Sequence, residues 1–364
     1  MPSVRLEKVE KRYDGIHAAH DLNLEVRDGE YLCLLGPTGA GKTTALRIIC
    51  GLTDPDSGKV FIGDKDVSNL EPELRGTALL SQTYSLFPQL TVAENILFGP
   101  DIRDLPEEER TRTLADMLDL VRLTKRPDAF PSELSGGMMQ RTALARALAS
   151  GAEVLLFDEP LRALDARLRI SLRHELRSLA KSLKITVIHV THDQDEALVM
   201  ADRIALIRNG HILQVGEPAQ VYDNPVSPFV ANFVGQSNFV TGRIIGKAEK
   251  KTSVRTESGM TVFARQCAME VGEQVVVGVK IGNTEIAREG DSFFDGIVER
   301  VLFEGRNLHV DILVEGTVHF SAMIPSWRLG KLASGDKVMI KWNAENASVF
   351  QMPEKGLREE LKVE

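Results

Sequence analysis

The chain has 364 residues, which exceeds one average domain and favours two. Its 44 basic and 52 acidic residues give a net charge of −8, which argues against general electrostatic binding of nucleic acid. Cys33, Cys50 and Cys267 show neither paired nor metal-ligand spacing, so we expect them in the core of a reduced, cytosolic protein. The first residues are charged where a signal peptide would be apolar, and no apolar run approaches the roughly 18 to 20 residues that span a bilayer. Any membrane role must therefore come through a partner.

The first 235 residues alternate short apolar runs with helical patterns. The apolar runs are typical of strands covered on both faces, and they include YLCLLG, EVLLFDEP and ITVIHVTH. Helical patterns between them include KTTALRIICGL and QRTALARALAS. This alternation, with tight Gly-rich turns, predicts an α/β fold with a largely parallel sheet. We assign residues 1–235 to this domain.

After about residue 236 the pattern changes to short alternating strands. Examples are NFVTGRIIG, EQVVVGVK, GIVERVLFEG and DKVMIKW. Glu315-Gly316 lies between two alternating runs and predicts a hairpin turn. Residues 236–364 are therefore expected to form a second, all-β domain, a small barrel or sandwich of OB-like size.

A Gly-rich loop, GPTGAGKTT, follows the strand YLCLL and precedes a helical pattern. It fits G-x-x-x-x-G-K-[ST] in the strand–loop–helix context that this motif requires. Its glycines let backbone N–H groups point at phosphate oxygens, and the helix adds its positive N-terminal end. Lys42 would reach the β- and γ-phosphates of ATP, and the Thr43 hydroxyl would bind Mg²⁺. The predicted phosphate-binding residues are Gly36, Pro37, Thr38, Gly39, Ala40, Gly41, Lys42, Thr43 and Thr44.

Two acids end the apolar strand EVLLFDEP. Asp158 would hold Mg²⁺ at the carboxyl end of the strand, and Glu159 would orient and deprotonate the water that attacks the γ-phosphate. Two acids after an apolar run are usually a solvated turn. Beside a complete phosphate loop, we favour the catalytic interpretation.

The segment LSGGMMQR precedes a helical pattern and resembles half of an anion site. Ser135, Gly136 and Gly137 would place a hydroxyl and free backbone N–H groups at the positive end of that helix. No lysine follows, so we expect this segment to receive a phosphate that another surface already holds.

In this order the motifs resemble those of the ATP-binding cassette (ABC) ATPases, over nearly all of residues 3–235. The resemblance implies a P-loop NTPase fold of the ABC type with a helical subdomain at about residues 84–150. It also implies further site residues, with Tyr13 stacking on adenine and a D-loop that ends at Asp165.

Two more roles follow from the same resemblance. Gln82 matches the glutamine loop and would contact Mg²⁺ or the attacking water when its loop moves inward. His192 matches the switch histidine and would hydrogen-bond the γ-phosphate while holding Glu159 and the water in place. The signature residues Ser135 to Gly137 would serve ATP bound to Lys42 of a second chain, which implies a head-to-tail homodimer.

The segment EPAQVYDNPVSPFVANFVGQSNF and the β tail resemble importer ATPases of the maltose, sulfate, iron and spermidine type. Such proteins have C-terminal TOBE (OB-like) folds. The resemblance implies a homodimer at the cytoplasmic face of the membrane, where ATP-driven closure acts on two integral-membrane permease subunits. These would receive solute from an extracytoplasmic binding protein and contact the segment from Gln82 to Phe98, whose apolar cluster comprises Leu86, Phe87, Pro88 and Leu90. Local core packing is the alternative for each of these apolar residues.

The alternative function is that of a soluble ABC ATPase acting in DNA repair or translation. Repair ATPases would need a coiled-coil insertion or zinc-binding Cys pairs, and ribosome-acting members have two cassettes, whereas this chain has one phosphate loop. A catalytically dead regulator is a third possibility, which the intact Lys42, Asp158, Glu159 and His192 oppose.

Three residues depart from the family pattern. Met138 and Met139 stand where glutamines are usual, and Arg162 stands in the D-loop where a small polar residue is common. Arg162 either pairs with a phosphate or an acid across a dimer or lies in solvent, and we expect solvent. The transported solute is not recorded in this sequence.

Overall fold

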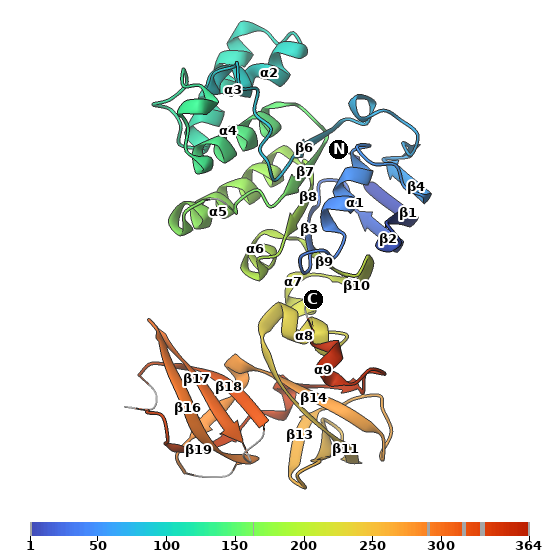
Figure 1. Ribbon diagram of the computed structural model, residues 1–364, viewed down its shortest axis with the longest axis vertical. Helices are drawn as coiled ribbons and strands as arrows, with labels where there is room; N and C mark the ends of the chain where they lie inside the picture. Colours follow the sequence, from blue (N-terminus) through green and yellow to red (C-terminus); the bar gives the residue numbers. More distant parts are fainter. Residues whose placement is uncertain (1, 163, 290–291, 315–317, 328–331, 363–364) are drawn as a thin grey trace. The chain divides into compact units, whose positions relative to one another are not determined.

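The computed structural model describes residues 2–162, 164–289, 292–314, 318–327 and 332–362. The chain divides into two compact units, Met1–Pro218 and Ala219–Glu364 (Figure 1). This division lies ahead of the boundary at 235/236 expected from the sequence. Residues 219–235 belong to the second unit, where Ala231 shares a small core with Val276 and Phe350.

A six-stranded sheet forms the centre of the first unit, in the order β10-β9-β3-β8-β7-β6. Its strands are β3 (Tyr31–Leu35), β6 (Thr77–Leu80), β7 (Val154–Asp158), β8 (Thr186–Thr191), β9 (Arg203–Arg208) and β10 (His211–Gly216). Neighbouring strands are parallel except β9 and β10, which are antiparallel. Every residue of β3, β7 and β8 is buried, as expected when both faces of a parallel sheet are covered. The predicted α/β fold with a largely parallel sheet is confirmed.

Helices of the first unit fall into two groups. One group packs beside the central sheet and comprises α1 (Lys42–Ile49), α5 (Ala166–Leu183) and α6 (Gln194–Met200). The other lies at one end of the unit (Figure 1) and comprises α2 (Val92–Ile102), α3 (Glu107–Leu120) and α4 (Gly136–Ala149). Helix α2 begins after Thr91 because Thr91 and Glu94 form a reciprocal capping box. This second group has its own core, which includes Ile96, Leu118 and Ala145.

A four-stranded antiparallel sheet, in the order β2-β1-β4-β5, completes the first unit. Its strands are β1 (Val4–Tyr13), β2 (Ile16–Val26), β4 (Ser57–Ile62) and β5 (Lys65–Asp66). Strand β2 was not among the strands expected from the sequence. Alternate residues of β2, among them Leu22 and Leu24, share one buried core with Leu46 and Ile49 of α1. The phosphate loop is therefore backed by both sheets of the unit.

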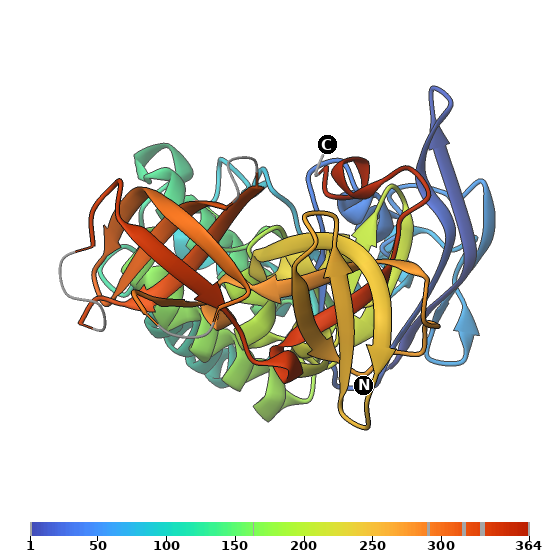
Figure 2. The ribbon, with the colours of Figure 1, turned by 90° about the horizontal axis from the view of Figure 1, so that it is seen from below.

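The second unit consists mainly of two five-stranded antiparallel sheets (Figures 1 and 2). The first, in the order β13-β12-β11-β14-β20, contains β11 (Ser237–Lys247), β12 (Lys251–Thr256), β13 (Thr261–Arg265), β14 (Gln274–Lys280) and β20 (Ala347–Gln351). The second, in the order β15-β19-β16-β17-β18, contains β15 (Glu285–Ala287), β16 (Phe294–Glu304), β17 (Asn307–Val314), β18 (Val318–Pro325) and β19 (Lys337–Lys341). One buried core joins them and includes Val277, Ile312 and Trp342. This agrees with the small all-β, OB-like domain expected after residue 236.

Short helices connect these elements: α7 (Pro218–Asp223), α8 (Pro228–Gly235), α9 (Leu357–Glu360) and the 3-10 turns η1 (Pro72–Leu74), η2 (Pro131–Glu133), η3 (Ile281–Asn283) and η4 (Ala344–Asn346). Cys33 and Cys50 are buried as expected, and Cys267 is partly buried. The hairpin turn predicted at Glu315-Gly316 lies outside the described residues, although the flanking strands β17 and β18 do pair antiparallel.

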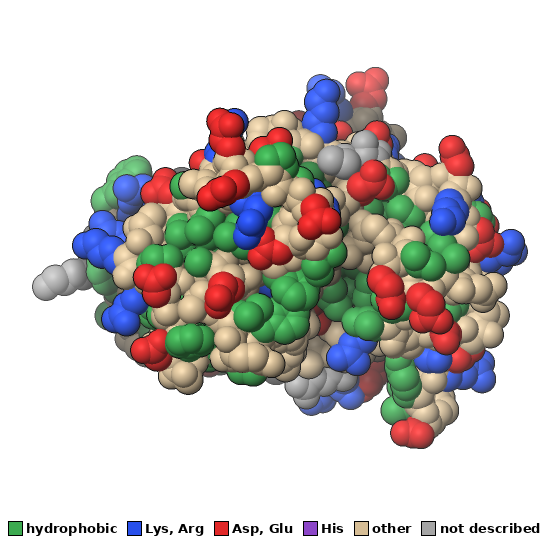
Figure 3. Space-filling view, turned by 90° about the horizontal axis from the view of Figure 1, so that it is seen from above, with side chains coloured by type: hydrophobic (Ala, Val, Ile, Leu, Met, Phe, Trp, Pro, Cys, Tyr) green, Lys and Arg blue, Asp and Glu red, His purple; other side chains and the backbone are tan. Residues whose placement is uncertain are grey.

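Two surface properties bear on partners. Within the described part of the chain, no helix combines the length and apolar character needed to cross a bilayer. On the face drawn in Figure 3, basic and acidic side chains are interspersed rather than gathered by sign. That face therefore offers no continuous basic surface for a nucleic acid.

Candidate functional site

The loop between β3 and α1 contains the predicted phosphate-binding glycines. Gly39 and Gly41 have φ angles of 79° and 100°, a region that glycine adopts far more readily than other residues. A Cβ atom at Gly41 would overlap the carbonyl oxygen of Ala18, and one at Gly36 would overlap that of Ile207. The surrounding strands therefore require glycine at positions 36 and 41 even without a ligand.

The remaining loop residues fall into buried and exposed sets. Pro37 and Ala40 are buried, and the Ala40 carbonyl accepts a hydrogen bond from the Gly210 amide at 3.0 Å. Thr38 is exposed, whereas Thr44 is partly buried in the first turn of α1. The backbone of the loop is thus fixed from behind while its outer rim remains accessible.

Lys42 folds over the phosphate loop. Its Nζ donates hydrogen bonds to the carbonyl oxygens of Gly36 and Pro37, at 2.8 and 2.7 Å. Desolvation by burial lowers the pKa of this lysine. An ammonium group has three donors, so Lys42 keeps one for a phosphate oxygen without leaving the loop.

Thr43 and Asp158 meet between α1 and the end of β7. The Thr43 hydroxyl donates to both carboxylate oxygens of Asp158, at 3.1 and 3.0 Å. Burial raises the pKa of the Asp158 carboxyl, and the hydrogen bond from Thr43 partly opposes this effect. A hydroxyl and a carboxylate side by side are the oxygen donors that Mg²⁺ prefers, so the two residues predicted to hold the ion fit it chemically.

Glu159 is the first residue beyond β7 and has an unusual backbone. Its φ of 52° lies in the left-handed region, where non-glycine residues are uncommon and often functional. Its amide donates to the carbonyl of Val190 at 3.0 Å, and its carbonyl accepts from Nε2 of Gln140 in α4 at 3.3 Å. These contacts fix the turn that directs the Glu159 side chain away from the strand. The role of Gln140 was not expected, because its position in LSGGMMQR says nothing about which loop its helix contacts.

Three polar side chains converge on the Glu159 carboxylate. Nδ1 of His192 lies 2.9 Å from Oε1, and Nε2 of Gln82 donates to Oε2 at 3.4 Å. The guanidinium of Arg162 donates to the same Oε2 at 2.9 Å. The structure therefore brings together Gln82, Glu159 and His192, which the sequence analysis had named from three separate segments.

Arg162 is exposed, as expected, and the structure adds a partner for it within the chain. Its side chain is 58% exposed, yet its guanidinium forms an ion pair with Glu159 of the same chain. The ion pair lies within a turn, in which the Arg162 amide also donates to the Glu159 carbonyl at 3.3 Å. No local sequence pattern marks that turn.

The signature segment lies at the start of α4. Ser135 caps this helix, and its Oγ accepts a hydrogen bond from the Met138 amide at 3.4 Å. Gly136 and Gly137 form the first helical positions. Figure 1 shows α4 in the separate helical group, apart from α1 and the phosphate loop. Within one chain the two predicted halves of the anion site are therefore not brought together.

Comparison with known proteins identifies the family. Residues 19–162 match the family model described as ABC transporter. Similar curated proteins include the spermidine/putrescine import ATP-binding proteins PotA of Thermobifida fusca and Thermotoga maritima, which are 38% and 35% identical to this chain. Both alignments cover 96% of this chain, and they cover 94% and 98% of the relatives. The chain belongs to the import ATP-binding proteins of the ABC transporter family.

A solved structure supports the same assignment for the ATPase. The ABC protein MJ0796, in a dimeric post-hydrolysis state bound to ADP and Pi, matches with a TM-score of 0.55 and 31% identity. The match covers 59% of this chain and 98% of that one. The interpretation of the sequence as an ATP-hydrolysing ABC importer subunit is confirmed, and none of these comparisons supports a role in DNA repair or translation.

Two more predicted contacts of this ABC ATPase lie at its surface. Tyr13 ends β1 with 46% of its area exposed, and Nζ of Lys11 lies 5.6 Å from its ring centroid. Asp165 caps α5 by accepting a hydrogen bond from the Leu168 amide at 3.0 Å. Residue 163 of the D-loop lies outside the described residues. The Tyr13 ring is accessible to a planar ligand, whereas Asp165 has a structural role in the free chain.

The two methionines of the signature helix have a packing explanation. Met138 and Met139 are partly buried and pack against the core of α2, α3 and α4. Thioether side chains fill such irregular apolar gaps well. Apolar contacts in the helical group therefore take the place of the polar groups that glutamines would supply.

Proposed function

We propose that this ABC ATPase binds Mg²⁺·ATP at residues 36–44 and hydrolyses it with Glu159 as the general base. The observation that supports this best is the convergence of Gln82, Arg162 and His192 on one carboxylate directly beside Asp158. A solvated acidic turn would not gather Gln82 and His192 from two distant segments of the chain.

The proposed chemistry assigns one task to each group. The Glu159 carboxylate accepts a proton from water as the water oxygen bonds to the γ-phosphorus, and the bond to the β–γ bridging oxygen breaks to release ADP. Lys42 supplies positive charge to the β- and γ-phosphates. His192, 2.9 Å from Glu159, holds the carboxylate in place and donates to a γ-phosphate oxygen.

Thr43 and Asp158 would hold the magnesium ion, with Gln82 as a further oxygen donor when its loop moves inward. Bound Mg²⁺ would neutralise part of the phosphate charge. The raised pKa of Asp158 reflects the cost of burying its negative charge, and a divalent cation would offset that cost.

We further propose a head-to-tail homodimer with two ATP sites. Ser135, Gly136 and Gly137 lie at the positive end of α4, and Figure 1 shows α4 in the helical group apart from α1. The similar protein MJ0796 is dimeric in its structure with ADP and Pi. A second chain would bring its own α4 to the ATP held by Lys42.

Permease subunits would bind the segment from Gln82 to Phe98, at the cytoplasmic face of the membrane. A cavity of about 470 Å³ borders this segment and is lined by Thr43, Leu46, Arg47, Leu52, Leu79, Ser81, Gln82, Thr83, Ser85 and Asp158. Tyr84 and Ser85 have φ angles of 63° and 45°, so the backbone after Gln82 is strained. Phe87 lies 4.3 Å from Phe98, between ring centroids, and is only partly buried. This cavity also contains the proposed Mg²⁺ ligands Thr43 and Asp158, so a partner helix that contacts the segment after Gln82 would bind next to the nucleotide site.

The solute is proposed to be a polyamine, delivered to the permeases by an extracytoplasmic binding protein. The relatives named above are spermidine/putrescine import ATP-binding proteins, and the alignments with this chain cover nearly their whole length. The complete transporter in vesicles tests this part separately: spermidine-loaded binding protein should stimulate ATP hydrolysis. Stimulation only by a sugar or an inorganic anion would reject the polyamine and leave the ATPase assignment intact.

The decisive experiment for hydrolysis is Glu159→Gln. The amide cannot accept the proton of water, so hydrolysis should fall by about 10²- to 10⁴-fold. ATP binding and ATP-dependent dimerisation, measured by fluorescent-nucleotide titration and size-exclusion chromatography, should persist. Glu153→Gln is the matched control, because Glu153 is an exposed acid just before the same strand. Unchanged hydrolysis by Glu159→Gln would reject Glu159 as the base.

A further inference from the structure

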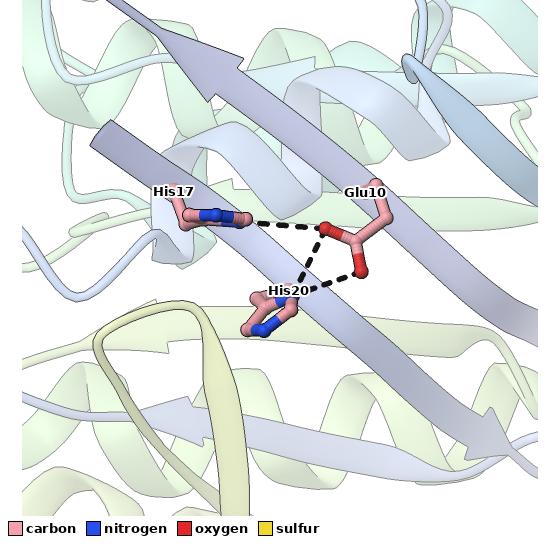
Figure 4. A group of neighbouring side chains, drawn as sticks. All are labelled: Glu10, His17 and His20. Carbon is pink, nitrogen blue, oxygen red and sulfur yellow. Dashed lines mark hydrogen bonds and ion pairs between the residues drawn. The ribbon is translucent and has the colours of Figure 1, made fainter. Parts of the chain in front are cut away.

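A group of metal-ligating side chains lies outside the nucleotide site. It comprises Glu10 of β1 with His17 and His20 of β2 (Figure 4). One ligand atom from each residue lies within 4.8 Å of the other two. None of these residues has a role in the ATP chemistry proposed above.

An irregularity in the β1–β2 ladder brings the two histidines to one side. Residues three apart on a regular strand point to opposite faces of the sheet. Here Lys11 pairs with Ala19 and Arg12 pairs with His17, so Ala18 is an extra residue in β2. Such a β-bulge redirects the side chains that flank it. The ring centroids of His17 and His20 are consequently only 4.3 Å apart.

The contacts within the group leave donor capacity unused. Nδ1 of His20 lies 2.9 and 3.1 Å from the two carboxylate oxygens of Glu10. The backbone amide of Asp21 donates to Oε1 of Glu10 at 2.8 Å, which fixes the orientation of the carboxylate. Nδ1 of His17 is itself buried and has no hydrogen-bond partner among the described residues, with Oε2 of Glu10 3.5 Å away. This buried ring nitrogen has only the longer ion-pair contact with the carboxylate, so its lone pair remains available to a metal ion.

A third imidazole lies beside the group. His211 begins β10, and its ring centroid lies 4.4 Å from that of His20. The two strands are held in place because the His20 amide donates to the carbonyl of Gly210 at 3.0 Å. The exposed His211 side chain is therefore the candidate for a fourth ligand.

We propose that Glu10, His17, His20 and His211 bind a divalent transition-metal ion such as Zn²⁺. Imidazole nitrogens with one carboxylate form a ligand set typical of Zn²⁺, Co²⁺ or Ni²⁺, whereas Mg²⁺ and Ca²⁺ prefer oxygen ligands alone. Bonds of about 2.0–2.2 Å around a tetrahedral ion place ligand atoms about 3.3–3.5 Å apart. The observed ligand atoms, all within 4.8 Å of one another, lie near that separation.

The position of the site gives the metal a structural consequence. Ala18 lies between the two histidines in the chain, and its carbonyl oxygen packs directly against Gly41 of the phosphate loop. A bound ion would therefore hold the strand that backs this loop. Metal binding itself requires no nucleotide, so its test is independent of the proposed ATP chemistry.

The test uses the full chain without a polyhistidine tag, free of nucleotide and Mg²⁺. Zn²⁺ binding is measured by competition with a chromophoric chelator, and Co²⁺ is added as a spectroscopic probe of four-coordinate geometry. We expect one high-affinity Zn²⁺ per chain and intense visible Co²⁺ bands. His17→Ala and His20→Ala should each weaken Zn²⁺ binding by at least about 10-fold, since loss of an outer-shell partner of a ligand alone costs 10- to 100-fold. His211→Ala should shift the Co²⁺ spectrum.

His319→Ala is the matched control, because His319 also contacts a carboxylate, that of Glu299, at 2.9 Å but belongs to no group of three metal-ligating side chains within the described part of the chain. It should leave Zn²⁺ affinity unchanged. Thermal unfolding in EDTA checks that the variants fold like the parent chain. Zn²⁺ affinity that is unaltered in the His17→Ala/His20→Ala double variant, or equally weak in every chain, would show an ordinary carboxylate–imidazole contact and overturn the proposal.

Discussion

The phosphate loop and the surroundings of Glu159 are held in place by different means. In the loop, backbone contacts decide the geometry: Gly41 packs against the Ala18 carbonyl, and Lys42 bonds two carbonyl oxygens of the loop itself. Around Glu159, side chains decide it, and the closest of them, His192 and Arg162, are more than half exposed.

This difference predicts that the two regions affect different properties, nucleotide affinity for the loop and the rate of hydrolysis for the surroundings of Glu159. A loop fixed by backbone packing loses little freedom when a phosphate binds, so it is preorganised for binding. A carboxylate held by exposed side chains can exchange its partners at low cost, because exposed ion pairs are weak. We therefore expect changes in the loop to act on stability and nucleotide binding, and changes around Glu159 to act on hydrolysis.

The largest expected effect comes from Gly41→Ala. The new Cβ would overlap the Ala18 carbonyl oxygen in a backbone region that is already unfavourable for alanine, so the free energy of unfolding should fall by at least about 3 kcal/mol. Gly39→Ala is the control, because its φ is also positive but no atom lies within 4 Å of the added Cβ. It should cost only about 1–2 kcal/mol. Equal losses in chemical denaturation would contradict a loop fixed by packing.

The next largest effect is expected at Ser135, in the signature segment that is proposed to bind the ATP of a second chain. Ser135→Arg would place a bulky cation at the positive end of α4, where a second chain's ATP is proposed to bind. Hydrolysis should fall by about 10²-fold or more, as when a preorganised anion donor is lost. The Kd of the monomer for ATP, measured by equilibrium titration at low protein concentration, should stay within about twofold of that of the parent chain. This is well below the tenfold change that corresponds to about 1.4 kcal/mol of binding free energy. Full activity in this variant would mean that α4 does not contribute to the site.

The smallest effect should come from Arg162→Ser. Removing the guanidinium leaves Oε2 of Glu159 with only the Gln82 amide as a donor, so the carboxylate is less restrained and hydrolysis should rise by about two- to fivefold, the range that corresponds to an exposed ion pair of about 0.5–1 kcal/mol. Stability should change by less than about 1 kcal/mol. Arg167→Ser, on the exposed surface of α5, serves as the control. A fall in hydrolysis would mean that Arg162 positions the base instead of restraining it.

The sequence was sufficient wherever a local pattern determines the backbone. The phosphate loop, the acidic end of β7 and the parallel sheet all follow from short motifs with correct flanking elements, and the structure places Thr43 on Asp158 as those motifs require. The change to alternating strands likewise predicted the all-β unit, because period-two patterning needs no long-range information.

What could not be predicted depends on local backbone exceptions and on packing partners. A turn brings Arg162 to the carboxylate of Glu159, and the bulge at Ala18 brings His17 beside His20 against the usual alternation of a strand. Residues 219–235 have a helical pattern that fits either unit, and only the contact of Ala231 with Phe350 shows which core they join.

The contact between Ala18 and Gly41 has a consequence for mutational tolerance. Glycine at position 41 is required by the packing of the strands, whereas a Cβ at position 39 would meet open space, so a side chain there would cost only the strain of its positive φ unless a phosphate must approach. A library of variants selected for folding alone should retain glycine at 41 and accept other residues at 39. The same library selected for ATP turnover should retain glycine at both positions. A position where glycine is retained only in the second selection is one that the ligand requires and the fold does not.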